Sequence, residues 1–216
     1  MEIGKFKAAL FDLDGVIFDT EPQYTIFWGR QCREFHPEHA GLEYEIKGQT
    51  LDQIFDAWFS GSLERVRPLV VARLNAFESQ MDFVYVAGFQ HFVEQLRSAG
   101  IKTAVVTSSN QAKMQSVYAA RPEFRASFDA ILTSEDFAES KPSPDCYLRA
   151  AERLEAKPHE CVVFEDSFNG LCSGRAADMT VVGLSTTNAS ESIRPLCDCV
   201  ISDYTNAENI KSMFNI

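Results

Sequence analysis

The sequence predicts an α/β fold of Rossmann-like type, with a doubly wound parallel sheet and a small α-helical block inserted after the first strand. Short apolar runs without polar alternation, such as residues 8–11 and 161–164, are typical of strands buried on both faces of a parallel sheet. Segments with apolar residues at helical spacing separate these runs, which favours alternating strands and helices. The chain has 216 residues and is 45% hydrophobic, which suits one large domain or a core with a smaller insert.

The strands are predicted from six short runs, each bounded by glycine or polar residues. They lie near residues 8–11, 103–106, 128–132, 161–164, 179–184 and 199–201.

The helices are predicted from capping residues and apolar spacing. Thr20 is a plausible N-cap for a helix continuing through 25–35, and Thr50 for a helix from Leu51. No strand-like run follows until residue 83, so we expect a helical insert over 20–87 and a core formed by 1–19 and 88–216. Further helices are expected at 66–81, 90–98, 145–154, 168–177 and 204–214.

The overall charge and hydropathy argue against several kinds of partner. A formal net charge of −11 disfavours nucleic acid and anionic membranes, since both require a basic face. No apolar run approaches the length that spans a bilayer. Residues 1–5 lack a signal-peptide pattern, so we expect a cytoplasmic protein. We also expect a monomer or a weak homo-oligomer.

The six cysteines show no spacing typical of a zinc site. The pair Cys197 and Cys199 could bind a soft metal or form a strained disulfide, but reduced thiols are the ordinary state in the cytosol. We therefore expect free thiols at all six positions, Cys32, Cys146, Cys161, Cys172, Cys197 and Cys199.

Two carboxylates, Asp12 and Asp14, follow the first predicted strand directly. Residues two apart in an extended chain point the same way, toward the strand end where open α/β sheets bind ligands. A hard divalent cation such as Mg²⁺ offsets their mutual repulsion. One carboxylate is then free to attack phosphorus while the other carries a proton. A solvated turn explains the Asp-x-Asp pair equally well.

Other predicted strands also end in polar residues that suit a phosphate. The hydroxyl-rich turn 107–110 offers hydroxyl and N–H groups, although Ser and Thr also cap helices there. Pro142 and Pro144 fix the backbone near Lys141, a residue type that is usually a solvated surface group. The acids Glu165 and Asp166 follow another strand, where a plain capping turn is the alternative.

These stretches occur in one order that resembles a known family. FDLDGVIFDTE, TSSN, KPSPD and FEDSFNG are similar to the four motifs of the haloacid dehalogenase (HAD) superfamily, in the subfamily I branch of phosphatases and β-phosphoglucomutases. The resemblance implies that Asp12 is the nucleophile and that Asp14 is the general acid/base. The family usually has glycine where this chain has Asp178, and Asp tolerates the left-handed conformation expected there.

The resemblance also implies a complete phosphate and metal site. Thr107 and the N–H of Ser108 would bind the phosphoryl group, and Lys141 would neutralise it. Mg²⁺ would be held by the carboxylates of Asp12 and Asp166 and the backbone carbonyl of Asp14, with Glu165 near or outside the first coordination shell.

The implied activity is Mg²⁺-dependent hydrolysis of a small phosphorylated metabolite such as a sugar phosphate. Lys47-Gly48-Gln49 resembles the loop by which the family's helical cap meets the substrate, so Lys47 is a candidate contact. The alternative is a β-phosphoglucomutase-like mutase, but the basic positions of those enzymes appear here as Tyr24, Leu51 and Leu74. A catalytically silent phosphate-binding protein is the distant alternative.

Overall fold

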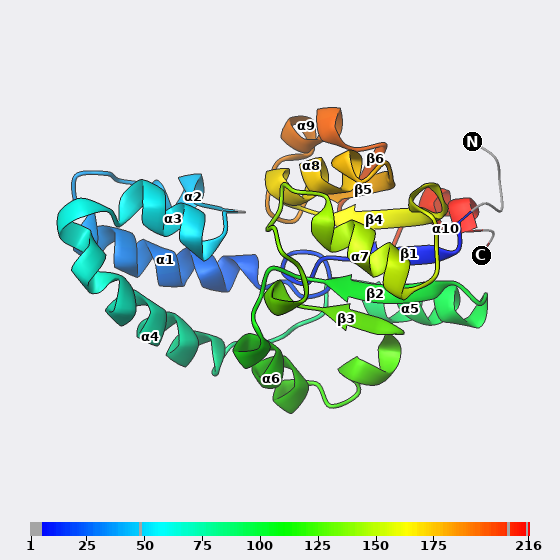
Figure 1. The fold of residues 1–216 in the computed structure, drawn as a ribbon, viewed down its shortest axis with the longest axis horizontal. Coiled ribbons are helices and arrows are strands. Elements are labelled where there is room, and N and C mark those ends of the chain that lie inside the picture. The colour runs from blue at the N-terminus through cyan, green and yellow to red at the C-terminus, as the bar shows by residue number, and fades with distance from the viewer. Residues whose placement is uncertain (1–5, 48, 207, 215) are drawn as a thin grey trace.

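Six parallel strands form a single sheet in the order β3-β2-β1-β4-β5-β6 (Figure 1). The computed structural model describes residues 6–47, 49–206, 208–214 and 216. Because β1 pairs in parallel with both β2 and β4, the carboxyl ends of these three strands lie side by side at one end of the sheet. The strands are β1 (Ala8–Phe11), β2 (Lys102–Val106), β3 (Ala130–Leu132), β4 (Cys161–Glu165), β5 (Thr180–Leu184) and β6 (Cys199–Ile201).

Helices cover both faces of the sheet, as the doubly wound prediction requires. Side chains of β1 alternate between two hydrophobic clusters: Ala9 and Phe11 pack with α5, α6 and α10, whereas Ala8 and Leu10 pack with α7, α8 and α9. The predicted fold class is therefore confirmed. These helices are α5 (Phe89–Ser98), α6 (Gln111–Ala120), α7 (Asp145–Arg153), α8 (Phe168–Ala176), α9 (Ser190–Ile193) and α10 (Glu208–Phe214).

In the described part of the chain between β1 and α5, four helices lie to one side of the sheet and form a separate hydrophobic cluster (Figure 1). We call residues 21–78 the helical insert. Its two connections run together, since Asp19 N–H donates to Val84 O at 2.9 Å and Val86 N–H to Ile17 O at 2.9 Å. The domain boundaries at 20 and 87 stay a prediction. The helices are α1 (Glu21–Phe35), α2 (Leu42–Glu45), α3 (Leu51–Trp58) and α4 (Arg67–Glu78).

Local signals in the sequence had mixed outcomes. Thr50 caps α3 in a capping box with Gln53, and Asp178 has a left-handed φ of 58°, both as predicted. Thr20 is the N-cap residue of α1, as predicted, but its side chain makes no capping hydrogen bond, because its hydroxyl donates to Asp14 instead. The last helix begins at Glu208 rather than at Tyr204, whose N–H donates to Ala87 O.

Two further expectations concern the whole chain. All six cysteines are free, as expected. Among the helices of the described residues, none is both long and apolar enough to span a membrane. Residues 1–5, and Gly48 of the predicted substrate loop, lie outside the described residues.

Asp178 offers a clean test of backbone conformation, because its side chain is exposed. A β-branched residue is strained in the left-handed region, which costs about 1–2 kcal/mol relative to ordinary backbone. We expect Asp178→Val to lower the free energy of unfolding by about that amount in urea titrations. Asp178→Gly should match or exceed the wild type, and equal stability of both variants would contradict the interpretation.

Candidate active site

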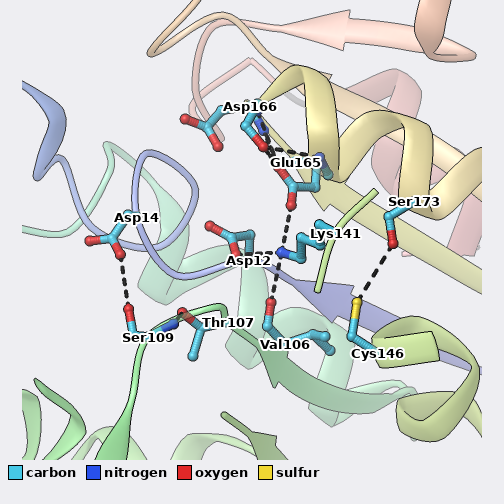
Figure 2. Close-up of polar contacts among 12 residues, drawn as sticks. Asp12, Asp14, Val106, Thr107, Ser109, Lys141, Cys146, Glu165, Asp166 and Ser173 are labelled. Atoms are coloured by element: carbon cyan, nitrogen blue, oxygen red, sulfur yellow. Dashed lines mark hydrogen bonds and ion pairs between the residues drawn. The ribbon is translucent and has the colours of Figure 1, made fainter. Parts of the chain in front are cut away.

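The ammonium group of Lys141 connects the ends of the three central strands (Figure 2). Its Nζ donates to Asp12 Oδ1 at 2.6 Å, Glu165 Oε1 at 2.6 Å and the carbonyl of Val106 at 3.0 Å. Asp12 follows β1, Val106 ends β2, and Glu165 ends β4. All three ammonium protons therefore donate hydrogen bonds. The lysine is only 4% exposed, so these contacts hold its ammonium in one position beside Asp12.

Glu165 is completely buried and its two oxygens are already occupied. Oε1 also accepts from Tyr147 Oη at 3.0 Å. Oε2 accepts from the backbone N–H of Asp166 and Ser167 and from the Ser167 hydroxyl, at 3.0–3.1 Å. These contacts make Glu165 an orienting partner of Lys141, consistent with a place outside the first coordination shell of a metal.

Three carboxylates lie close together at the strand ends, and Lys141 neutralises only part of their charge. Oxygens of Asp12, Glu165 and Asp166 lie within 4.8 Å of one another. Burial raises the pKa of Asp12 to about 7, although the neighbouring Lys141 lowers it. Burial, and then the charges of Glu165 and Asp12, raise the pKa of Asp166 well above its usual value. Buried oxygen donors with excess negative charge fit a hard divalent cation.

Asp14 has a different set of partners from Asp12. Its Oδ1 accepts from Thr20 Oγ1 at 2.6 Å, and its Oδ2 accepts from Ser109 Oγ at 3.3 Å and from Lys113 Nζ. Figure 2 shows the carboxylate facing Ser109, whereas that of Asp12 faces Lys141. The two acids are thus held by separate groups, which suits two separate roles.

The sequence analysis missed Lys113, and it placed Ser109 in the phosphate turn without its contact to Asp14. One signal was available: Asn110 caps α6, so Lys113 falls in the first turn of the helix that follows the TSSN stretch. A cation in that turn lies against the strand end, but its contact with Asp14 joins residues 99 positions apart. No local pattern reports such a contact.

The turn after β2 carries the two predicted phosphate contacts. Thr107 is buried, and its Oγ1 accepts from the N–H of Ser109 at 3.0 Å, which tightens the turn. Ser108 is exposed. The turn therefore presents a side-chain hydroxyl and backbone N–H groups to a cavity that Asp12 also lines.

A cavity of about 460 Å³ separates the helical insert from the strand ends. Glu165 is absent from the described residues that line it, as its position behind Lys141 requires. Lys47 lies in the wall with its Nζ 3.9 Å from Glu21 Oε2. The predicted site residues that the cavity brings together are Asp12, Asp14, Lys47, Thr107, Ser108, Lys141 and Asp166.

Comparison with known proteins shows which family the chain belongs to. The model of the haloacid dehalogenase-like hydrolase family matches residues 6–178. The chain belongs to this family. It is therefore a hydrolase, as the sequence motifs implied.

Individual relatives cover the chain to different extents. A bifunctional riboflavin kinase/FMN phosphatase of Arabidopsis thaliana is 31% identical over 89% of the chain, which spans only 54% of that protein. A validoxylamine A 7'-phosphate phosphatase of Streptomyces hygroscopicus subsp. limoneus is 27% identical, over 93% of the chain and 95% of the relative.

The fold is also shared with solved structures. A HAD hydrolase of family IA, variant 3, from Entamoeba histolytica superposes with a TM-score of 0.84 and 22% identity, over 97% of this chain and 98% of that one. The likeness extends across the sheet and the helical insert, because nearly the whole chain is covered.

Gly170 tests whether Glu165 needs its present position. A Cβ at this helical glycine would overlap the Glu165 carboxylate, so Gly170→Ala must displace either α8 or the partner of Lys141. Overpacking of this kind costs about 1–3 kcal/mol, more than the helix propensity gained. We expect urea titration to show a lower free energy of unfolding.

Gly29→Ala is the matched control, since Gly29 is also helical. There the nearest atom to a new Cβ is the flexible end of Arg33, at 3.1 Å. This variant should be neutral or stabilised. Equal stability of Gly170→Ala and wild type would show that Glu165 can move freely.

Proposed function

We propose that this protein is a Mg²⁺-dependent phosphatase that hydrolyses a small phosphate monoester through an aspartyl-phosphate on Asp12. The observation that carries the proposal is the meeting of Asp12, Lys141 and Asp166 at one end of a cavity large enough for a small metabolite. The named activities of the relatives support the reaction class, since both act as phosphatases on small phosphorylated molecules.

The carboxylates of Asp12 and Asp166 and the backbone carbonyl of Asp14 would hold the cation, with Glu165 behind them. Mg²⁺ supplies positive charge that offsets the charge on the phosphoryl oxygens during transfer. Lys141 supplies a further fixed charge, because its three hydrogen bonds leave the ammonium beside Asp12.

The chain's own groups divide the reaction into two steps. A carboxylate oxygen of Asp12 attacks phosphorus and the ester P–O bond breaks, while Asp14 gives its proton to the departing alkoxide oxygen. Water then attacks the aspartyl-phosphate and gives a proton to Asp14, so that both acids return to their starting states. Thr107 and the N–H of Ser108 bind the phosphoryl oxygens throughout.

The helical insert is proposed to act as the cap that closes over the substrate. Lys47 lines the cavity opposite the strand ends, and we assign it a contact to the leaving group. Six free thiols suit a reducing compartment, so the proposed location is the cytoplasm. The proposed form is a monomer or weak homo-oligomer that acts on metabolites rather than on nucleic acid or membranes.

The nucleophile is tested by Asp12→Asn, which keeps the shape of the side chain but removes the attacking charge. We expect phosphate release from a panel of sugar phosphates, phosphoglycolate and nucleotides by the wild type with Mg²⁺. Release should stop with EDTA, and should fall at least 1,000-fold in the variant, on the order expected when covalent catalysis is lost. Asp56→Asn, at an exposed position of α3, is the control.

Near wild-type turnover by Asp12→Asn would contradict the nucleophile assignment. A wild-type protein that binds phosphate but releases none from any ester would favour the silent binding protein. Release that is insensitive to EDTA would contradict the metal requirement.

A mutase is disfavoured by the residues that line the cavity. Tyr24, Leu51 and Leu74 stand where β-phosphoglucomutases resembling this chain carry basic groups, and all three line the cavity. Neither leucine nor a neutral phenol can pair with a second phosphate. Among the described residues, the lining contains seven acids and three lysines: Asp12, Asp14, Glu21, Glu43, Asp52, Glu78 and Asp166 against Lys47, Lys113 and Lys141.

We therefore expect net phosphate release and little conversion of β-glucose 1-phosphate to glucose 6-phosphate, even after priming with the bisphosphate. A coupled glucose 6-phosphate dehydrogenase assay measures the conversion, and a phosphate assay run in parallel measures hydrolysis. Primed mutase turnover well above the rate of phosphate release would replace the phosphatase with the mutase.

A further inference from the structure

Lys113 is a buried cation that the reaction outlined above does not use. Its side chain is 3% exposed, and its Nζ contacts Asp14 Oδ2. The other partners of Asp14 are the neutral hydroxyls of Thr20 and Ser109. Lys113 therefore makes the one ion pair to Asp14 among the described residues, and charge-assisted hydrogen bonds are roughly twice as strong as neutral ones.

The backbone and the ammonium group of Lys113 are both held by residues of the α/β core. Its backbone N–H donates to the side chain of Asn110 at 2.9 Å, which ties the residue to the first turn of α6. The turn before this helix contains Thr107 and Ser109, which flank the phosphate end of the cavity. The ammonium thus reaches Asp14 from the first turn of the helix that directly follows the turn assigned to the phosphoryl group.

The helical insert holds the other side of Lys113. Its Nζ lies 4.8 Å from the ring centroid of Tyr24 on α1, within the range of a cation–π contact. The phenol of Tyr24 donates to Glu78 Oε1 at 2.7 Å, and Glu78 ends α4. Burial raises the pKa of Glu78, and the positive charge of Lys113 partly offsets that rise.

We infer that Lys113 is a positioning residue that fixes the carboxylate of Asp14 for proton transfer and makes that position depend on Tyr24 and Glu78 of the helical insert. A misplaced acid loses most of its effect, since an error of about 1 Å costs on the order of 100-fold in rate. The inference rests on the proposed function, because Asp14 matters only where a leaving oxygen needs a proton.

The choice of leaving group isolates this role. An alkyl phosphate needs a proton on its departing oxygen, whereas 2,4-dinitrophenyl phosphate releases a stable phenolate without one. We expect Lys113→Met to lower kcat/KM for the best alkyl phosphate at least tenfold, and to lower it less than threefold for the dinitrophenyl ester. Lys113→Arg should restore part of the ratio, because it keeps the charge.

Two further variants show that Lys113 acts through Asp14 and the helical insert. In an Asp14→Asn background, Lys113→Met should change the ratio of the two kcat/KM values less than twofold, because the group it positions is gone. Glu78→Gln should shift the ratio in the same direction as Lys113→Met. Lys102→Met, at an exposed ion pair with Asp129, should leave it unchanged.

The outcomes separate this inference from the proposed function. A wild-type protein that releases no phosphate from either ester overturns both. Wild-type activity with an equal loss on both esters in Lys113→Met shows a structural role and overturns the positioning role alone. An unchanged ratio in Glu78→Gln overturns the dependence on the helical insert.

Discussion

The buried ammonium of Lys141 is the interaction on which the candidate site depends. It joins the carboxyl ends of three neighbouring strands by hydrogen bonds of 2.6–3.0 Å to Asp12, Glu165 and Val106. Burial by itself lowers the pKa of Lys141, but the charges of Asp12 and Glu165 outweigh it and raise the pKa well above its usual value. The lysine therefore stays charged although it is buried, and it fixes Asp12 relative to β4.

The ammonium of Lys141 does not balance all of the negative charge at the strand ends. Three carboxylates lie close together and two of them contact the ammonium of Lys141, and burial raises the pKa of Asp12 and of Asp166. Such a site is poorly balanced without a further cation, and its clustered carboxylate oxygens fit a divalent metal ion. Glu165 takes part by holding Lys141, and Gly170 leaves the space in which its carboxylate fits.

A second set of contacts holds Asp14, two residues after Asp12. Asp14 is held by Thr20 at the entrance to α1, by Ser109 after β2, and by Lys113 of α6. Thr20 and Tyr24 belong to the segment where the chain enters the helical insert. The proposed acid/base is thereby connected to the insert, whereas the proposed nucleophile is held by Lys141 of the α/β core.

The sequence by itself determined the sheet, the strand ends and most of the site. Buried parallel strands consist of short apolar runs, and polar residues directly after them must lie at one edge, so Asp12, Thr107 and Asp166 could be placed together without coordinates. Lys141 was found by its motif rather than by physics, since a lone lysine next to proline is ordinarily a surface group. Thr50 and Asp178 were predicted correctly because capping and left-handed backbone are local properties.

Only the tertiary structure decided which groups hold the two acids. Lys113 meets Asp14 across 99 residues, and the Thr20 hydroxyl donates to Asp14 instead of making a capping hydrogen bond in α1. The first contact joins α6 to the turn after β1, and the second joins that turn to the start of α1. Side-chain partners of this kind are chosen by competition among donors and acceptors in three dimensions, and residue spacing along the chain carries no record of that competition.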